Sequence, residues 1–155
     1  MAETGMKQVW SGGLTRLDLT DLEGVGAHRF EGGNVYKYVK FNDGAANEVG
    51  VAGEVCYYHT LDGYKTFTVT SDISDTIEIG AGVLQAALDD GNFGWIQIKG
   101  AALLTIALTA GTDGDPLTPT GTTNGSLDLS AAVTDHVCAF AGDISDKEII
   151  CDFPW

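Results

Sequence analysis

The sequence predicts a single all-β domain, folded as an antiparallel β-sandwich or barrel. Three observations predict it: short segments in which apolar and polar residues alternate, β-branched and aromatic residues concentrated in those segments, and glycines placed between them. Alternation with period two is typical of strands with one buried face, and glycine reaches the positive φ angles that tight turns need. Sandwich, jelly roll and barrel all give this signal, so the strand order stays open.

Seven segments have the strand pattern. They are Val35–Phe41, Lys65–Thr70, Thr76–Ile79, Trp95–Lys99, Ala101–Leu108, Val137–Phe140 and Glu148–Phe153. In the first segment, the side chains of Val35, Val39 and Phe41 fall on one face. Those of Tyr36 and Tyr38 fall on the other. Asn-Gly and Asp-Gly pairs elsewhere in the chain are typical of hairpin turns.

The 155 residues are predicted to form an extended N-terminal arm, residues 1–13, and one domain, residues 14–155. A chain of this length has the usual size of one domain with its own core. Residues 111–125 are rich in glycine, proline and threonine, and we expect an exposed loop there, inside the domain, because strand patterns resume after it. The arm lacks the apolar segment of a signal peptide.

The charge balance limits the partners. The chain has 22 acidic and 8 basic residues, a net charge of −14. Nucleic acid is bound by clustered lysine and arginine that replace counterions on phosphate, and an anionic membrane attracts the same residues. Because the basic residues are scattered, we expect neither nucleic acid nor a membrane as a partner. The excess acid suits a basic protein surface.

No motif indicates catalysis. The sequence has no G-x-S-x-G elbow, phosphate loop or dinucleotide fingerprint. Cys56 and His59 have the spacing of half a zinc site, but nothing marks a second pair of ligands. Asp113 and Asp115 resemble a fragment of a calcium loop without its remaining ligands, and are more typical of a turn. The sequence therefore predicts no enzyme activity, no metal and no cofactor. It favours three reduced cysteines, with a bridge between Cys138 and Cys151 as the alternative, because these two lie in segments that could pair as neighbouring strands.

The tryptophans indicate where contacts form. Trp95 is predicted in the core or on a sheet face. Trp10 and Trp155 lie in terminal segments, which fray unless something holds them. Buried tryptophan is enriched at interface hot spots, so both are candidate anchors in a neighbouring subunit; the alternative is that both fold back on the domain's own core. The candidate interface residues are Met6, Val9, Trp10, Leu14, Tyr36, Tyr38, Phe153 and Trp155.

Two segments together resemble small virion proteins of tailed phages, including capsid cement (decoration) proteins. The first, residues 26–55, holds His28-Arg29-Phe30, the strand VYKYVKF and the stretch GAANEVGVAGEV. The second begins with NFGWIQIKG and continues through an alanine-rich strand, a GDPL turn and a Gly-Ser-Leu segment. The resemblance implies an all-β homotrimer, made in the host bacterial cytoplasm, which binds the major capsid protein on the outside of the virion.

Two functions therefore lead. The first is a capsid cement protein that stabilises the shell through protein–protein contacts. The alternative is a virion-associated carbohydrate-binding module for host attachment, in which exposed Tyr57, Tyr58, Tyr64 or Trp95 would stack on sugar rings. A small hydrolase ranks last, since it needs a concave pocket with convergent polar groups.

Overall fold

The computed structural model describes residues 9–60, 62–119 and 121–155, and it confirms the all-β class. Its strands are β1 (His28–Glu31), β2 (Asn34–Phe41), β3 (Val55–His59), β4 (Thr68–Thr70), β5 (Thr76–Leu84), β6 (Phe93–Leu103), β7 (Pro116–Thr118), β8 (Asp128–Leu129), β9 (Ala139–Asp143) and β10 (Glu148–Asp152). A one-turn helix, α1 (Gly63–Thr66), and a 3-10 turn, Ile73–Asp75, complete the regular structure of these residues. No helix in the described ranges is long and apolar enough to cross a membrane.

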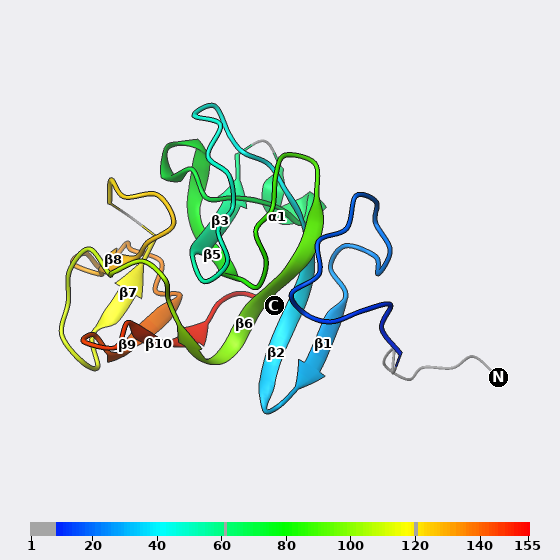
Figure 1. Cartoon of the computed structure of the whole chain (residues 1–155). Helices are drawn as coiled ribbons and strands as arrows, with labels where there is room; N and C mark the ends of the chain where they lie inside the picture. The colour runs from blue at the N-terminus through cyan, green and yellow to red at the C-terminus, as the bar shows by residue number, and fades with distance from the viewer. Residues whose placement is uncertain (1–8, 61, 120) are drawn as a thin grey trace.

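Five strands close into a barrel. The pairings run β2–β4–β3–β5–β6, and β6 then returns to pair with β2. The β2–β4 pair is parallel, and the other pairs of the ring are antiparallel. The barrel occupies the centre of Figure 1. Closure removes the free edges at which an open sheet pairs with other chains, so this part of the molecule is a self-contained scaffold.

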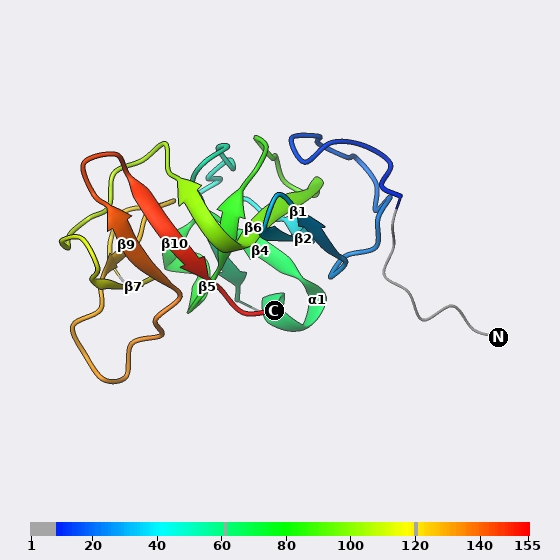
Figure 2. The same ribbon diagram turned by 90° about the horizontal axis from the view of Figure 1, so that it is seen from below.

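The long strand β6 continues beyond the barrel into a second sheet. Its C-terminal half pairs with β10, which is followed by β9, β7 and β8, all antiparallel. The change of partner occurs around Gly100, whose φ is +98°, and an added Cβ there would collide with the side chain of Asn34. Glycine meets both demands. Figure 2 shows the second sheet beside the barrel.

One core joins the two parts, and β3 is buried on both of its faces. Val55–Tyr58 has no exposed surface at any of its four positions, although successive side chains of a strand point to opposite faces. The neighbouring strand β5 contacts the second sheet at Gly80, where an added Cβ would lie 2.8 Å from Sγ of Cys138. The buried apolar residues of the barrel and of the second sheet form a single cluster.

The alternation predicted for β2 is confirmed. Val35, Val39 and Phe41 belong to the main core. Tyr36 and Tyr38 point to the other face and form a second cluster with Trp95 of β6. That face lies outside the barrel and is covered by residues of the N-terminal segment. Trp95 is therefore a buried sheet-face residue, as predicted.

The predicted strand Lys65–Thr70 begins too early. Residues 63–66 form α1 instead, and Phe67 ends that turn in the left-handed conformation, with a φ of 55°. Phe67 N–H donates to the carbonyl of Gly63, which closes the turn. Only Thr68–Thr70 remains extended, so the local turn overrides the alternating pattern.

The segment 111–125 is not wholly an exposed loop. It contains β7, where Leu117 is fully buried and pairs with Ala139 of β9 and Leu129 of β8. Proline starts the strand, a position at which its missing N–H is tolerated. Because residues 111–125 are rich in turn-forming residues, their composition does not indicate this strand of three residues.

Replacing Gly82 with alanine should destabilise the barrel by about 1–3 kcal/mol. An added Cβ would lie 2.7 Å from the carbonyl oxygen of Gln97 on β6, and backbone of a paired strand cannot move aside without breaking the pairing. Chemical denaturation measures the loss. Gly13→Ala is the control, because no atom lies within 4 Å of its added Cβ. Equal stability of the two variants would contradict the close β5–β6 contact.

Candidate protein interface

The N-terminal residues that the structure describes lie against the outer face of the barrel. The ring of Trp10 meets that of Trp95 edge to face, with centroids 5.0 Å apart. The guanidinium of Arg29 lies 5.8 Å from each of the two ring centroids, within the range of a cation–π contact. Leu14 packs in the same cluster, whereas Val9 is exposed. Of the two possibilities given by the sequence, an anchor in a neighbouring subunit or a side chain folded back on its own chain, Trp10 adopts the second.

Tyr36 and Tyr38, two further interface candidates, are buried beneath this segment. The hydroxyl of Tyr38 donates to the carboxylate of Asp18 at 2.6 Å, and burial raises the pKa of Tyr38 above its usual range. Asp18 also pairs through its backbone with Phe93 of β6. The chain's own N-terminal segment therefore covers these tyrosines, and their side chains are not presented to a partner. Met6 lies outside the described residues.

The two aromatic residues at the C-terminus have different environments. Phe153 is fully buried in the main core, and its N–H donates to the carbonyl of Ile98. Trp155 is 56% exposed. Phe153 therefore holds the C-terminal segment on the chain's own core, and Trp155 alone of the two is available to a partner.

Lys37, a buried lysine of β2, is hydrogen-bonded to the C-terminal segment. Nζ of Lys37 donates to the hydroxyl of Tyr58 and to the carbonyl of Pro154, both at 2.9 Å. The side chain is fully buried, and the described residues include no ion-pair partner for it. Burial lowers the pKa of Lys37 to about 8, because the charged form loses its hydration.

Trp155 is the centre of a group that we call the C-terminal aromatic cluster: the half-buried His28 and Lys99 and the exposed Phe30 and Trp155. The ring centroid of Trp155 lies 5.6 Å from that of His28 and 6.3 Å from that of Phe30. Nζ of Lys99 lies 5.4 Å from the same ring. Phe30 is also exposed, so the cluster presents two large aromatic side chains to solvent.

A second exposed apolar surface lies on the second sheet, and we call it the outer patch: Ala101, Leu103, Phe140 and Ile150. Ile150 of β10 is directly opposite Ala101 of β6 and Phe140 of β9, and Phe140 is opposite Pro116 of β7. Residues opposite one another in antiparallel strands share a face. Leu103 is 66% exposed and Ile150 50%. Apolar side chains thus cross four strands on the solvent side of the sheet.

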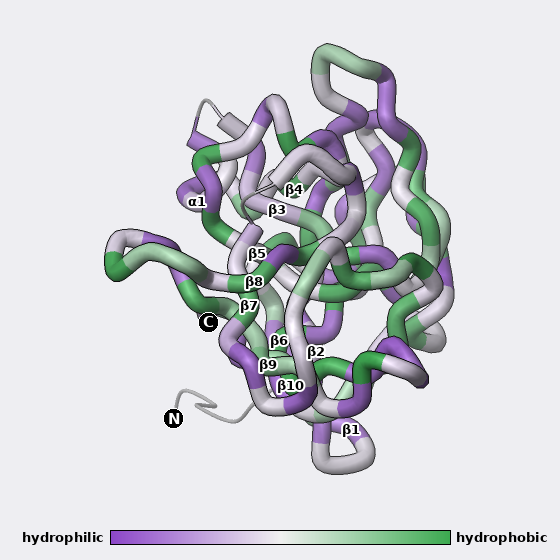
Figure 3. Tube along the Cα trace, turned by 90° about the vertical axis from the view of Figure 1, so that its left-hand side faces the viewer, coloured by the Kyte–Doolittle hydropathy of each residue, from purple (hydrophilic) through white to green (hydrophobic). Residues whose placement is uncertain are grey.

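Sequence reasoning missed the outer patch, although β10 carries a signal for it. Glu148, Ile150 and Asp152 alternate with the buried residues Ile149 and Cys151. Ile150 therefore occupies the polar phase of its strand, between two acids. An isoleucine in that phase indicates an exposed apolar residue. Figure 3 views the molecule from the side on which β7, β8 and β9 lie, and hydrophobic stretches of the chain alternate there with hydrophilic ones.

Acidic side chains lie beside the outer patch on the same face. Glu148 is opposite Leu103 of β6 and Asp143 of β9, and Asp152 is opposite Lys99 of β6. Residues opposite one another in antiparallel strands share a face. The two lysines of this region already have partners: Nζ of Lys99 contacts Asp152 at 2.6 Å, and Nζ of Lys147 donates to the carbonyl of Thr105. The patch is therefore an apolar centre with a predominantly acidic rim.

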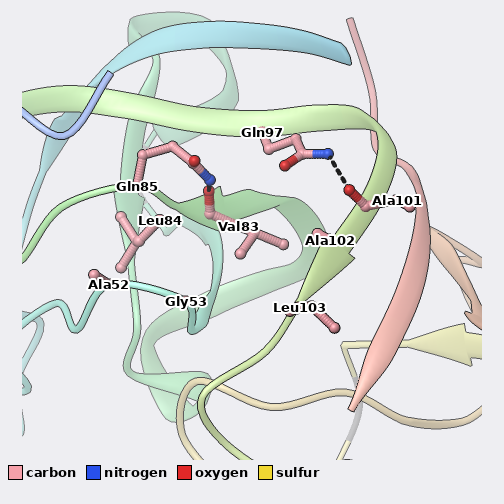
Figure 4. Close-up of a pocket in the computed structure, with 9 residues that line it drawn as sticks. All are labelled: Ala52, Gly53, Val83, Leu84, Gln85, Gln97, Ala101, Ala102 and Leu103. Carbon is pink, nitrogen blue, oxygen red and sulfur yellow. Dashed lines mark hydrogen bonds between the residues drawn. The ribbon is translucent and has the colours of Figure 1, made fainter. Parts of the chain in front are cut away.

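A groove of about 340 Å³ opens beside the outer patch, and Ala101 and Leu103 line both. Figure 4 shows its walls, which come from β5, β6 and the segment before β3. Its lining is Ala52, Gly53, Val83, Leu84, Gln85, Gln97, Ala101, Ala102 and Leu103. None of these side chains titrates, so the groove offers no general acid or base. It is suited to receive an uncharged side chain.

The thiols are also unsuited to chemistry. Cys56, Cys138 and Cys151 are free and buried, and burial raises the pKa of each thiol, that of Cys151 to about 12. A thiol is nucleophilic only as the thiolate. Among the described residues no three His, Cys, Asp or Glu side chains gather as metal ligands would.

No protein-family model matches the chain, and no curated protein matches it in sequence. Among solved structures, the chain is similar to one described as the N base of the head fiber gp8.5 in bacteriophage phi29. The similarity covers 76% of this chain and 93% of that chain, with a TM-score of 0.49 and 15% identity. No residue role is carried from that protein to this one.

Replacing Trp10 with alanine should lower the free energy of unfolding by about 2 kcal/mol, because the ring contacts with Trp95 and Arg29 are lost. Chemical denaturation followed by far-UV circular dichroism measures the change, because this signal does not depend on the number of tryptophans. Val9→Ala is the control, since Val9 is 78% exposed and should change stability little. Unchanged stability of the Trp10 variant would mean that this ring is free to anchor in a partner.

Lys37→Met should change how stability depends on pH. The folded-state pKa of Lys37, about 8, lies below its ordinary value of 10.5, so between these values the unfolded chain binds more protons. The buried lysine therefore costs stability at pH 7, and the cost shrinks as the pH rises above 8. Between pH 7 and 9.5 the parent should gain about 2 kcal/mol relative to the variant.

Denaturant unfolding of both chains at the two pH values gives this difference directly. Burial raises the pKa values of the buried thiols and tyrosines above this pH range, so these groups stay protonated in the folded state of both chains and their contributions cancel. A stability difference that does not change with pH would show that Lys37 keeps an ordinary pKa in the folded chain.

Proposed function

We propose that this chain is a capsid cement protein, a virion structural protein that binds the outer surface of a phage head and stabilises the shell through protein–protein contacts. The observation that carries the proposal is the outer patch, an exposed apolar face on a closed β scaffold. Exposed apolar surface of this kind is typical of sites that bind other proteins. The resemblance of residues 26–55, and of the segment that begins with NFGWIQIKG, to phage virion proteins supports the same function.

The scaffold suits this role because it is complete before any partner binds. The barrel is closed, and both terminal segments are held on it by Trp10 and Phe153. A pre-organised surface loses little conformational entropy on docking. In this proposal the major capsid protein is the partner, the chain acts as a homotrimer on the capsid exterior, and neither nucleic acid nor a membrane takes part.

Repetition over the shell increases the effect of each contact. Stable interfaces bury about 800 Å² on each partner, and a closed trimer presents the same surface to three neighbours. Simultaneous contacts bind far more tightly than one contact alone. A subunit of 16.3 kDa is large enough to supply such a surface.

The carbohydrate-binding alternative loses the residues on which it depended. Trp95, Tyr57 and Tyr58 are buried, so their rings cannot stack on a sugar. Tyr64 is half exposed, but its ring packs edge to face against Tyr58, with centroids 4.9 Å apart. We therefore keep the cement function as the proposal.

The purified chain should bind empty heads of the phage that encodes it, and should raise the temperature at which those heads disassemble. Sedimentation of heads with bound chain measures occupancy, and light scattering during heating measures shell stability. An unrelated acidic protein of similar size is the control for charge alone. Occupancy no higher than that of the control, with an unchanged disassembly temperature, would contradict the proposal.

A further inference from the structure

We propose that the outer patch is the docking surface for a different protein, one with an apolar centre and a basic rim, and that copies of this chain do not meet there. The inference rests on the proposed function and extends it, because it assigns the surface and the chemistry of the partner. Four observations support it: the exposed apolar side chains of the outer patch, their continuity with the C-terminal aromatic cluster, the adjoining groove and the acidic rim.

The outer patch alone is small for an interface. Four strands about 4.8 Å apart and five residues of about 3.3 Å each give a face of about 15 Å by 15 Å, roughly 200 Å². A stable interface buries about 800 Å² on each partner. The outer patch therefore serves as the centre of a larger contact.

The C-terminal aromatic cluster extends the surface. Lys99 of the cluster connects it to the outer patch. Its Nζ contacts Asp152, which is next to Ile150 on the solvent face, and also lies over the ring of Trp155. Trp155 and Phe30 then continue the apolar surface toward β1. A partner seated on Ile150 can therefore also reach Trp155, and tryptophan is among the side chains that contribute most at interfaces.

The adjoining groove gives the partner a place for an anchoring side chain. The amide of Gln97 donates to the carbonyls of Lys99 and Ala101, at 3.2 and 2.9 Å, and that of Gln85 donates to the carbonyl of Val83. Both amide donors are thus directed at the chain's own backbone. None of the side chains that line the groove is charged, so an uncharged anchor fits better than a charged one.

The acidic rim excludes a second copy and selects a basic partner. If two outer patches faced each other, Glu148 and Asp143 of one copy would approach the same acids of the other. A partner with lysine or arginine around its apolar centre replaces this repulsion with attraction, which speeds association and fixes orientation.

The first test removes the apolar centre. In the double variant Ile150→Thr and Leu103→Thr, polar side chains that keep strand propensity replace two exposed apolar ones. We expect the dissociation constant for empty heads to rise about tenfold or more. Ile77→Thr is the matched control, because Ile77 is also an exposed residue of a strand, 42% exposed on β5. Thermal unfolding checks that every variant stays folded.

The second test reverses one charge of the rim. Glu148→Lys should weaken head binding severalfold, and the remaining binding should depend less on salt between 50 and 500 mM, because an attractive charge pair is lost. Asp90→Lys is the control for net charge. Asp90 lies in the turn before β6, whereas Glu148 is opposite Leu103 at the other end of that strand.

The outcomes separate the two proposals. If the parent chain binds heads and both patch variants bind as their controls do, the assignment of this surface is wrong while the cement function stands. If the Thr variant instead dissociates an oligomer in sedimentation velocity, and its head binding is otherwise that of the parent, the patch joins copies and the inference is overturned. If the parent does not bind heads, the proposed function fails, and the partner assigned here fails with it.

Discussion

The pairing of β2 with β6 is the constraint on which the rest of the molecule depends. It closes the barrel, and so separates an inner face of β2, bearing Val39 and Phe41, from an outer face bearing Tyr38. The same strand β6 then leaves the barrel to support the second sheet. Without this pairing, the tyrosine face would have no neighbouring Trp95, and the N-terminal segment would have nothing to cover.

Closure also decides which apolar side chains remain outside. The aromatic side chains of β2, β3 and β6 are used within the chain, and Trp10 and Phe153 hold the two terminal segments on it. The apolar side chains that remain exposed include those on the far face of the second sheet and the ring of Trp155. The buried charge of Lys37 is a cost within this arrangement, offset in part by the hydrogen bond that ties it to the carbonyl of Pro154.

Periodicity predicted the faces of strands but not what covers them. The alternation in Val35–Phe41 correctly placed Tyr38 and Val39 on opposite faces, yet Tyr38 was expected at an interface because its cover comes from residues distant in sequence. Leu117 was missed because three residues are too few to show a period, and their neighbours are turn formers. The exposure of Ile150 depends on the second sheet having no layer outside it, which is a property of the topology and not of the local sequence.

In the proposed function, one face of a closed scaffold contacts the capsid shell. Hydroxyl-radical footprinting of the chain, free and bound to heads, is the sharpest test of this contact, because side-chain oxidation reports solvent access residue by residue. We expect protection of Leu103, Phe140, Ile150 and Trp155, with exposed side chains of the N-terminal segment such as Leu19 unchanged. Protection confined to the N-terminal segment, with the second sheet as reactive as in the free chain, would contradict it.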